Sequence, residues 1–135
     1  MSFERFVRAK CVEMVVKQPE ASIRANGKIG FNRKASEEYN LYDFDYVVLF
    51  FDRVTRIVGM RFINDCEEEG ACKLSRGNGG KELYISAKVF LKRYGLLRTK
   101  SYSFAMERIL PGLNGNPFDD LLVFKAVRQQ GRPRI

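Results

Sequence analysis

Hydrophobic and polar residues alternate between Ser22 and Phe31, and this alternation predicts a β-hairpin. Its two strands flank Asn26-Gly27, the dipeptide best suited to a type I′ turn, because both central residues of that turn need a positive φ. One face of the hairpin is apolar and the other is basic. Asn32 follows the second strand and is predicted to cap a short helix through its side-chain oxygen.

A second hairpin is predicted after this helix. The run Tyr46–Phe51 is apolar, β-branched and aromatic, which is typical of a central strand. A turn that begins at Asp52-Arg53 leads into a return strand at Ile57–Met60, which continues to Ile63. The N-terminal segment is ambiguous: its apolar spacing favours an amphipathic helix over residues 2–11 that covers one end of the core, whereas its valines favour a strand.

The pattern of strand, turn, strand and helix returns from Lys73, with a short strand predicted over Lys73–Arg76. Gly77–Gly80 is predicted to be a hairpin loop, Ser86 to cap a helix over Ala87–Tyr94, and Leu121–Val127 to form the last strand. Repeated units of this kind usually share one core, because neither closes a core alone. The plain alternative is that any two strand–turn–strand–helix units look alike.

The register of the two units supports a repeat. Ile85 follows Phe31 by 54 residues (85−31) and Tyr102 follows Tyr46 by 56 (102−46), so the register drifts by only about a residue either way. We therefore expect a mainly β fold with short helices, namely a small β-barrel closed by two pseudo-symmetric hairpin–helix–hairpin units. The expected divisions are a covering segment at 1–21, a first unit at 22–63, an acidic linker at 64–72, a second unit at 73–127 and a basic disordered tail at 128–135.

The first unit resembles the AbrB-type swapped-hairpin domain. Gly27-Lys28-Ile29 stands where that family has Gly-Arg-Ile, a short helix leads to Leu41, and Asp45 opens a valine-rich strand. The chain departs from the family in lacking its proline after the second strand and in carrying Phe44 in place of its glycine. The second unit matches more weakly. The resemblance implies an AbrB-like or double-psi-like barrel with interleaved hairpins, and it implies DNA binding by a transcriptional regulator or antitoxin.

The net charge of +8 is concentrated in the second half of the chain, since residues 73–108 hold 9 basic and 2 acidic side chains. Such a concentration attracts polyanions. AbrB-like proteins present basic side chains of their first hairpins to DNA, so the hairpins and helices of both units are the expected contacts. The alternative for any one of these side chains is an ordinary solvated surface. The predicted contacts are Arg24, Lys28, Arg33, Lys34, Lys73, Arg76, Lys81, Lys88, Lys92, Arg93, Arg132 and Arg134.

The last two of these contacts belong to the C-terminal tail. Gly131-Arg132-Pro133 resembles the core of an AT-hook, which lies in the minor groove of A·T-rich DNA. Gln130 stands where such a motif has a preceding arginine. The tail is therefore expected to be a basic arm that adds to the interface.

Catalytic and cofactor chemistry is not expected from this sequence. There is no histidine, which removes the usual general base and the common nucleophile pairs. Three cysteines without zinc spacing favour free thiols, and the glycine-rich loop at 77–80 precedes a strand where a phosphate loop would precede a helix. We expect neither enzyme activity nor a cofactor or metal. The longest apolar run is too short to span a bilayer, so a cytoplasmic protein without membrane contact is expected.

Two functional hypotheses lead after these exclusions, and a third, an enzyme on a related barrel, ranks last because the sequence has no histidine, metal cluster or nucleophile constellation. The first is a DNA-binding regulator or antitoxin-like protein that holds phosphates with its basic hairpins, with double-stranded DNA as partner. The second is a protein-interaction or assembly module whose basic face meets an acidic partner, including the acidic linker of another copy in a homo-oligomer.

Overall fold

The computed structural model of the chain describes residues 18–65, 70–109, 121–126 and 132–133. The strands are β1 Glu20–Ile23, β2 Lys28–Phe31, β3 Tyr46–Asp52, β4 Ile57–Ile63, β5 Ala71–Lys73, β6 Ser75–Gly77, β7 Glu82–Ser86, β8 Tyr102–Ile109, β9 Leu121–Lys125 and β10 Arg132–Pro133. The short helices are α2 Arg33–Glu38 and α3 Lys88–Arg93, with single 3₁₀ turns η1 Leu41–Asp43 and η2 Asn78–Gly80. The mainly β fold class is confirmed.

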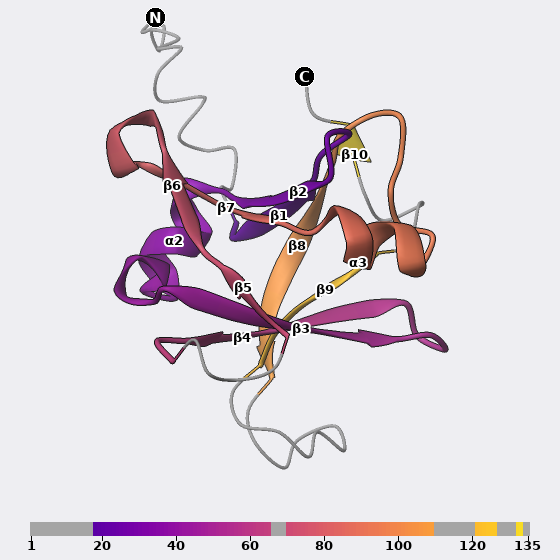
Figure 1. Cartoon of the computed structure of the whole chain (residues 1–135), viewed down its shortest axis with the longest axis horizontal. Coiled ribbons are helices and arrows are strands. Elements are labelled where there is room, and N and C mark those ends of the chain that lie inside the picture. Colours follow the sequence, from indigo (N-terminus) through magenta and orange to yellow (C-terminus); the bar gives the residue numbers. More distant parts are fainter. Residues whose placement is uncertain (1–17, 66–69, 110–120, 127–131, 134–135) are drawn as a thin grey trace, which may run out of the picture.

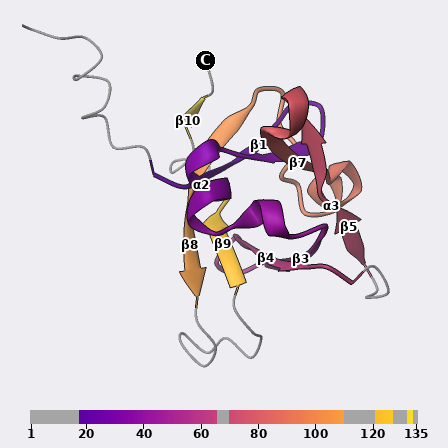
Figure 2. The same ribbon diagram turned by 90° about the vertical axis from the view of Figure 1, so that its left-hand side faces the viewer.

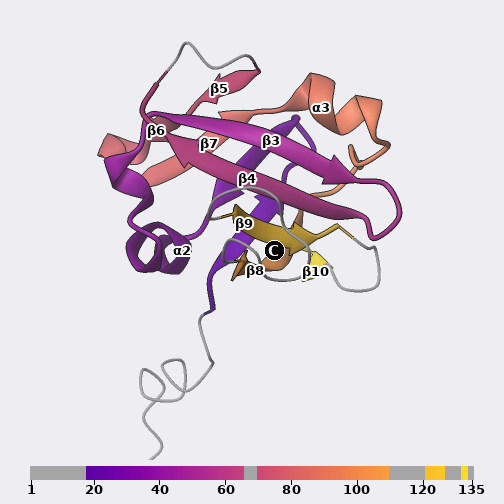
Figure 3. The same ribbon diagram turned by 90° about the horizontal axis from the view of Figure 1, so that it is seen from below.

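The strands form a nearly closed antiparallel barrel. Within the described residues, nine strands follow the order β5-β3-β4-β9-β8-β1-β2-β7-β6, and β10 pairs with β8. Figure 1 shows β1, β2, β7 and β6 as one layer, β3, β4 and β9 as the opposite layer, and β8 crossing between them. The barrel has α2 at one end and α3 at the other, as the side view in Figure 2 and the view from below in Figure 3 confirm.

Two segments join the layers and so close the barrel. Strand β8 pairs with β1 through residues 102–105 and with β9 through residues 106–109. On the other side, β5 pairs with β3 and β6 pairs with β7, and these two short strands are separated only by Leu74. The Leu74 side chain is buried, and its N–H donates to the carbonyl of Asp45 at 2.8 Å. The predicted single strand at 73–76 is therefore two strands that pair with opposite layers.

The core fills the space between the layers. Alternate residues of β2 and β7, such as Ile29 and Ile85, are fully buried, as the sequence pattern predicts. From the opposite side, Phe104 and Phe124 stack with their ring centroids 5.6 Å apart. Leu41 and Leu96 follow α2 and α3 respectively and are also fully buried. Fully burying a leucine or phenylalanine side chain stabilises the folded state by about 1.5–3 kcal/mol.

The first hairpin lies where the sequence predicts, but its turn type is different. Ile23 pairs with Ile29, and the Gly27 N–H donates to the Arg24 carbonyl at 2.9 Å. Gly27 has φ +90°, whereas Asn26 is not in the positive-φ region. The prediction of a type I′ turn is therefore wrong: three loop residues with a glycine bulge replace the two-residue turn.

The helix start at Asn32 is confirmed. Asn32 Oδ1 accepts from the N–H of Ala35 at 2.8 Å, the N-cap bond expected from its side chain. The corresponding prediction for Ser86 is wrong, because Ser86 belongs to β7 and Ala87 precedes α3 without a side-chain cap. Helix α3 ends at Arg93, close to the predicted end at Tyr94, and Gly95 beyond it has φ +68° and lets the Leu96 N–H donate to the Leu91 carbonyl at 2.8 Å.

Several predicted segments fall largely outside the described residues. These are the covering segment before residue 18, residues 66–69 of the acidic linker, the loop at 110–120 and most of the tail. In the tail, Arg132 and Pro133 pair with Ser103 and Tyr102 of β8. In the part of the chain that is described, no helix has the length and apolar character needed to cross a membrane.

Candidate nucleic-acid interface

Helix α3 is held at one end of the barrel by the first hairpin. The Ala87 N–H donates to the Gly27 carbonyl at 2.9 Å, and Leu91 buries its side chain fully in the core. An ideal Cβ built on Gly27 would lie 2.6 Å from Cβ of Lys88, so the turn and the helix touch. Because α3 has only six residues, this packing holds it in place.

An aromatic cluster joins α3 to the end of β3, beside the β3–β4 turn. The rings of Phe51 and Tyr94 have centroids 4.6 Å apart, and Phe90 lies 5.1 Å from Tyr94 and 6.4 Å from Phe51. Such pairs add about 0.5–1.5 kcal/mol each beyond the area they bury. The cluster brings the basic residues of a turn and of a helix, distant in sequence, to one surface.

Three arginines lie over these rings. The Arg53 guanidinium is 4.9 Å from the Tyr94 centroid, that of Arg93 is 5.8 Å from the same ring, and that of Arg56 is 5.3 Å from the Phe51 ring. None of the three forms an ion pair with a carboxylate of the described residues. Stacking orients a guanidinium and leaves N–H donors at its edge, which is the geometry that binds phosphate oxygens.

The β3–β4 turn is held by its own backbone. Asp52 Oδ1 accepts from the N–H groups of Val54 at 2.9 Å and Thr55 at 3.3 Å. These bonds, the one from Val54 first, lower the pKa of Asp52 below its usual value. Arg56 has φ +62°, its N–H donates to the Asp52 carbonyl, and its carbonyl accepts from the Ala126 N–H, both at 2.8 Å. The turn therefore presents its arginines on a defined backbone.

The two ends of the barrel differ in charge. We call residues 52–56 at the β3–β4 turn, α3 and the loop at 95–101 the α3 end, and we call α2, the connection at 40–45 and residues 76–81 the α2 end. The α3 end has seven basic residues and one acidic residue, and the α2 end has four of each. At the α3 end these are Arg53, Arg56, Lys88, Lys92, Arg93, Arg98, Lys100 and Asp52. At the α2 end they are Arg33, Lys34, Arg76, Lys81, Glu37, Glu38, Asp43 and Asp45.

Four of the predicted contacts are paired with carboxylates. Arg33 pairs with Glu37 at 2.7 Å and Lys34 with Glu38 at 4.0 Å, both along α2. The bond to Glu37 raises the pKa of Arg33. Arg24 and Arg76 pair with residues from other elements, as described below. Lys81, the fourth cation of the α2 end, is exposed. Because Arg33, Lys34 and Arg76 are paired with carboxylates, the α2 end offers fewer free cations than the sequence suggests.

Arg24 serves the barrel wall. It pairs with Glu82 of β7 at 2.5 Å, and its side chain is only 18% exposed. The guanidinium lies across Gly30 of β2, where any Cβ would overlap it. Beside it, the Lys28 ammonium lies 4.5 Å from the centroid of the Tyr84 ring. The outer face of the first hairpin, predicted to be a row of free cations, is therefore partly neutralised by β7.

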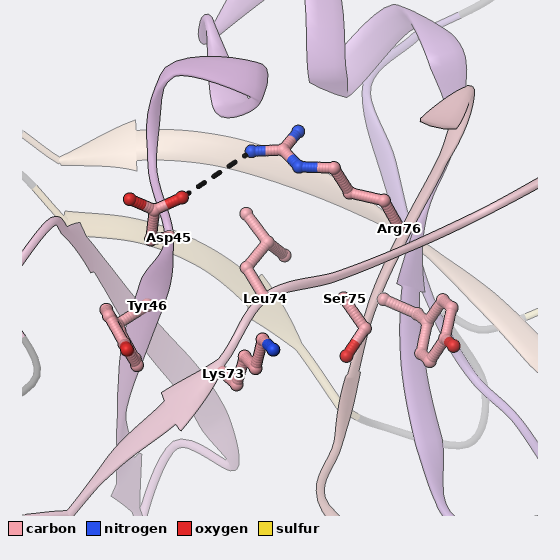
Figure 4. A pocket seen from close by; sticks show the side chains of 7 residues that line it. Asp45, Tyr46, Lys73, Leu74, Ser75 and Arg76 are labelled. Carbon is pink, nitrogen blue, oxygen red and sulfur yellow. Dashed lines mark ion pairs between the residues drawn. The ribbon is translucent and has the colours of Figure 1, made fainter. Parts of the chain in front are cut away.

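Arg76 and Lys73 meet at an open hollow of about 540 Å³ where β5 gives way to β6. Arg76 donates to the carbonyls of Tyr42 at 3.0 Å and Phe44 at 3.1 Å and lies 3.8 Å from the Asp45 carboxylate. Figure 4 shows its guanidinium reaching across the hollow toward Asp45. Arg76 thus holds the η1 connection in place, and Lys73 is the exposed cation of this wall. The hollow is lined by Asp45, Tyr46, Lys73, Leu74, Ser75, Arg76 and Tyr84.

The structure brings Lys88, Lys92 and Arg93 together with basic residues that the sequence analysis missed. Those are Arg53 and Arg56 of the β3–β4 turn, and Arg98 and Lys100 of the loop after α3. The sequence could have indicated the first two, because Arg53 and Arg56 stand three residues apart in a predicted turn. The side chain of Arg132 and the whole of Arg134 lie outside the described residues. Among those that are described, no group of acidic, cysteine or histidine side chains could hold a metal ion.

Replacing Asp52 by asparagine removes the only carboxylate of the α3 end while keeping an oxygen that can cap the turn. We expect affinity for duplex DNA to rise about threefold at low salt, because one repulsive charge is lost from the surface. Fluorescence anisotropy with a labelled duplex measures this. Asp43→Asn at the α2 end is the matched control and should change nothing. Equal gains in both variants would contradict the assignment of the interface to the α3 end.

The same carboxylate gives the turn a defined pH dependence. Because the pKa of Asp52 is lowered in the folded protein, its stabilisation of the turn is present above its unfolded pKa and is lost as the pH falls through the folded pKa. The asparagine variant should lack this dependence, since its amide does not titrate.

Cys72 is a free thiol that packs against the core from β5. Burial raises the pKa of this thiol, which keeps it protonated and poorly nucleophilic. The other two cysteines lie outside the described residues.

Comparison with known proteins finds no matching family model, no similar curated protein and no similar solved structure.

Proposed function

We propose that this chain is a DNA-binding protein of the transcriptional-regulator or antitoxin type and that duplex DNA lies against its α3 end. The observation that carries the proposal is the segregation of charge, seven basic residues to one acidic at the α3 end against four to four at the α2 end. A field of one sign over a compact surface draws in a polyanion, and each phosphate that is neutralised releases counterions.

The arginines add geometry to this charge. Arg53, Arg56 and Arg93 are oriented by aromatic rings, so less side-chain freedom is lost when their N–H groups bind phosphate oxygens. Lys88 and Lys92 are exposed on α3 beside them and act as point charges. The two kinds of cation together match a backbone-binding surface, on which affinity comes before base recognition.

We also propose that the barrel consists of two related units, as in the AbrB-type domain that the sequence resembles. The strand order supports this, because each hairpin of the first half, β1–β2 and β3–β4, lies between two strands of the second half. The register of β2 with β7 supports it further: Ile29 pairs with Ile85, and Phe31 pairs with Leu83. A shift of 54 residues, the spacing of Phe31 and Ile85 (85−31), exchanges these two pairs and centres the pairing on Gly30 and Tyr84.

The test of DNA binding is a salt series with the full chain and a labelled duplex, read by fluorescence anisotropy. Contact with about five phosphates predicts micromolar or tighter affinity at low salt and a slope of log K against log salt of about −4 to −5. An affinity weaker than micromolar at low salt would contradict the proposal.

The same assay separates DNA from an acidic protein partner. Polyglutamate carries a similar charge density without the spacing of a duplex. If polyglutamate competes as well as unlabelled duplex at equal charge concentration, the α3 end is better assigned to an acidic protein. If duplex competes far better, binding depends on the geometry of DNA.

A further inference from the structure

The tip of the β3–β4 hairpin has an unusual surface. Val54 is 92% exposed, the most exposed large apolar side chain named among the described residues, and it lies between Arg53 and Arg56 of the same turn. Figures 1 and 3 show this turn projecting at the end of the barrel that carries α3. A single exposed valine is ordinary, but here it stands at the end of a projecting ribbon with an arginine on each side.

The tip is held rigid although it is exposed. The Val54 N–H is bound to the Asp52 carboxylate at 2.9 Å, and the Arg56 carbonyl is bound to the N–H of Ala126 at 2.8 Å. Behind the tip, β4 is paired with β3 on one side and with β9 on the other. A rigid apolar tip needs little ordering on binding, which favours its insertion into a partner.

The rest of the ribbon carries a different chemistry from its tip. Phe51 packs into the aromatic cluster with Tyr94, and Phe50 lies beneath the Arg61 guanidinium at 5.9 Å. The ribbon therefore does not offer a long basic face of the kind that could lie flat in a major groove. Within the β3–β4 ribbon, only the turn combines cations with an exposed large apolar side chain.

We propose that this tip enters the minor groove of duplex DNA, with Val54 as an apolar wedge against the base edges and with Arg53 and Arg56 in or beside the groove. This inference rests on the proposed function and specifies how the DNA is held. The minor groove is about 6 Å wide, has an enhanced negative potential where it narrows, and is widened by proteins that insert apolar side chains between base steps. Insertion bends the duplex toward the major groove, away from the wedge.

The experiment compares bending with affinity on one A·T-rich duplex that carries a donor and an acceptor dye at its ends. The wild-type chain is expected to raise the energy transfer on binding. Val54→Ser should abolish most of that increase and weaken affinity about five- to tenfold, while leaving the salt slope unchanged because no charge is lost. Arg53→Gln should instead lower the magnitude of the slope by about one unit.

Val89→Ser is the matched control. Val89 is 83% exposed on α3, inside the α3 end but away from the tip, so its replacement should leave the bending of bound DNA unchanged, and bending is the readout on which the two valine variants are compared. Because both valines are exposed, neither change is expected to disturb folding, and a thermal melt of each variant verifies this. A minor-groove ligand such as netropsin should displace the wild-type chain, whereas a major-groove dye should not.

The outcomes separate the two proposals. If the wild-type chain does not bind duplex DNA, both the proposed function and the wedge are wrong. Normal salt-dependent binding in which Val54→Ser bends DNA like the wild type, or in which netropsin fails to compete, would overturn only the wedge. Binding of the wild type to vesicles rich in anionic lipid that depends on Val54, without any effect of Val54 on DNA bending, would assign the tip to a membrane surface instead.

Discussion

Exchanging Lys88, Lys92 and Arg93 for glutamine is expected to weaken binding to duplex DNA about a hundredfold at moderate salt. Each phosphate contact contributes about 0.9 to the magnitude of the salt slope, so the loss of three contacts should reduce it by about 2.7. Glutamine is a helix former of nearly the same rank as lysine and arginine, so α3 should persist in the variant. Anisotropy titrations across a salt series measure both quantities.

A second triple variant controls for net charge. It removes an equal number of positive charges from the α2 end, by replacing Arg33, Lys34 and Lys81 with glutamine. Arg33 and Lys34 are paired with carboxylates on their own helix and Lys81 lies apart from α3, so affinity should change only a few-fold through the long-range field. Equal losses in the two triple variants would show that binding follows the overall charge of the chain and not the α3 end.

Gly27→Ala is expected to destabilise the protein strongly, through both backbone strain and a clash with α3. A side chain at φ +90° is strained, which costs about 1–3 kcal/mol. The new Cβ would also lie 2.6 Å from Cβ and 3.1 Å from Cα of Lys88, so the hairpin and α3 would have to separate. Overpacking of this kind adds about 1–3 kcal/mol, and the free energy of unfolding should fall by about 2–6 kcal/mol in all. Denaturant titration measures the loss.

Gly95→Ala separates strain from contact in that result. Gly95 also has a positive φ, +68°, but nothing lies within 4 Å of the position its Cβ would occupy. This variant should lose only the conformational term, about 1–2 kcal/mol. If Gly27→Ala were no more costly than Gly95→Ala, then the contact between the first turn and α3 would contribute nothing to stability.

The hydrophobic pattern was enough to predict where the strands lie, because burial alternates with the pleat. Ile29 and Phe31 of β2 and Leu83 and Ile85 of β7 are buried as the alternation requires. The cap at Asn32 was likewise readable, since its bond to Ala35 depends only on residues three positions apart. Local chemistry therefore predicts the elements of this barrel well.

The features that sequence reasoning missed depend on distant parts of the chain. Asn26-Gly27 favours a two-residue turn on its own. In the barrel, β1 pairs with β8 as well as with β2, and the register of β1 with β2 leaves three residues in the loop. The local sequence does not indicate that the strand is divided at Leu74. The division arises because β5 pairs with one layer and β6 with the other. Arg24 looks like a free cation in sequence, yet its partner Glu82 comes from the other half of the barrel.

The candidate interface was predicted only in part for the same reason. Lys88, Lys92 and Arg93 were visible as a charged helix. Arg53 and Arg56 were not connected with them, because the link is the packing of Phe51 on Tyr94 across the barrel end. Counting charges along the sequence shows that basic residues are concentrated in the second half of the chain. It does not distinguish cations that are paired with carboxylates from cations that are free.

The position of β1 between β2 and β8 bears on how the chain folds as it leaves the ribosome. Glu20 pairs with Ala105, and Lys28 pairs with Ser86. Both edges of the first hairpin therefore pair with strands that are synthesised much later than the hairpin itself. The nascent hairpin consequently exposes two unpaired strand edges until β7 and β8 have been synthesised, and exposed strand edges favour chaperone binding and aggregation. A high contact order of this kind also places the folding rate toward the slow end for a domain of this size.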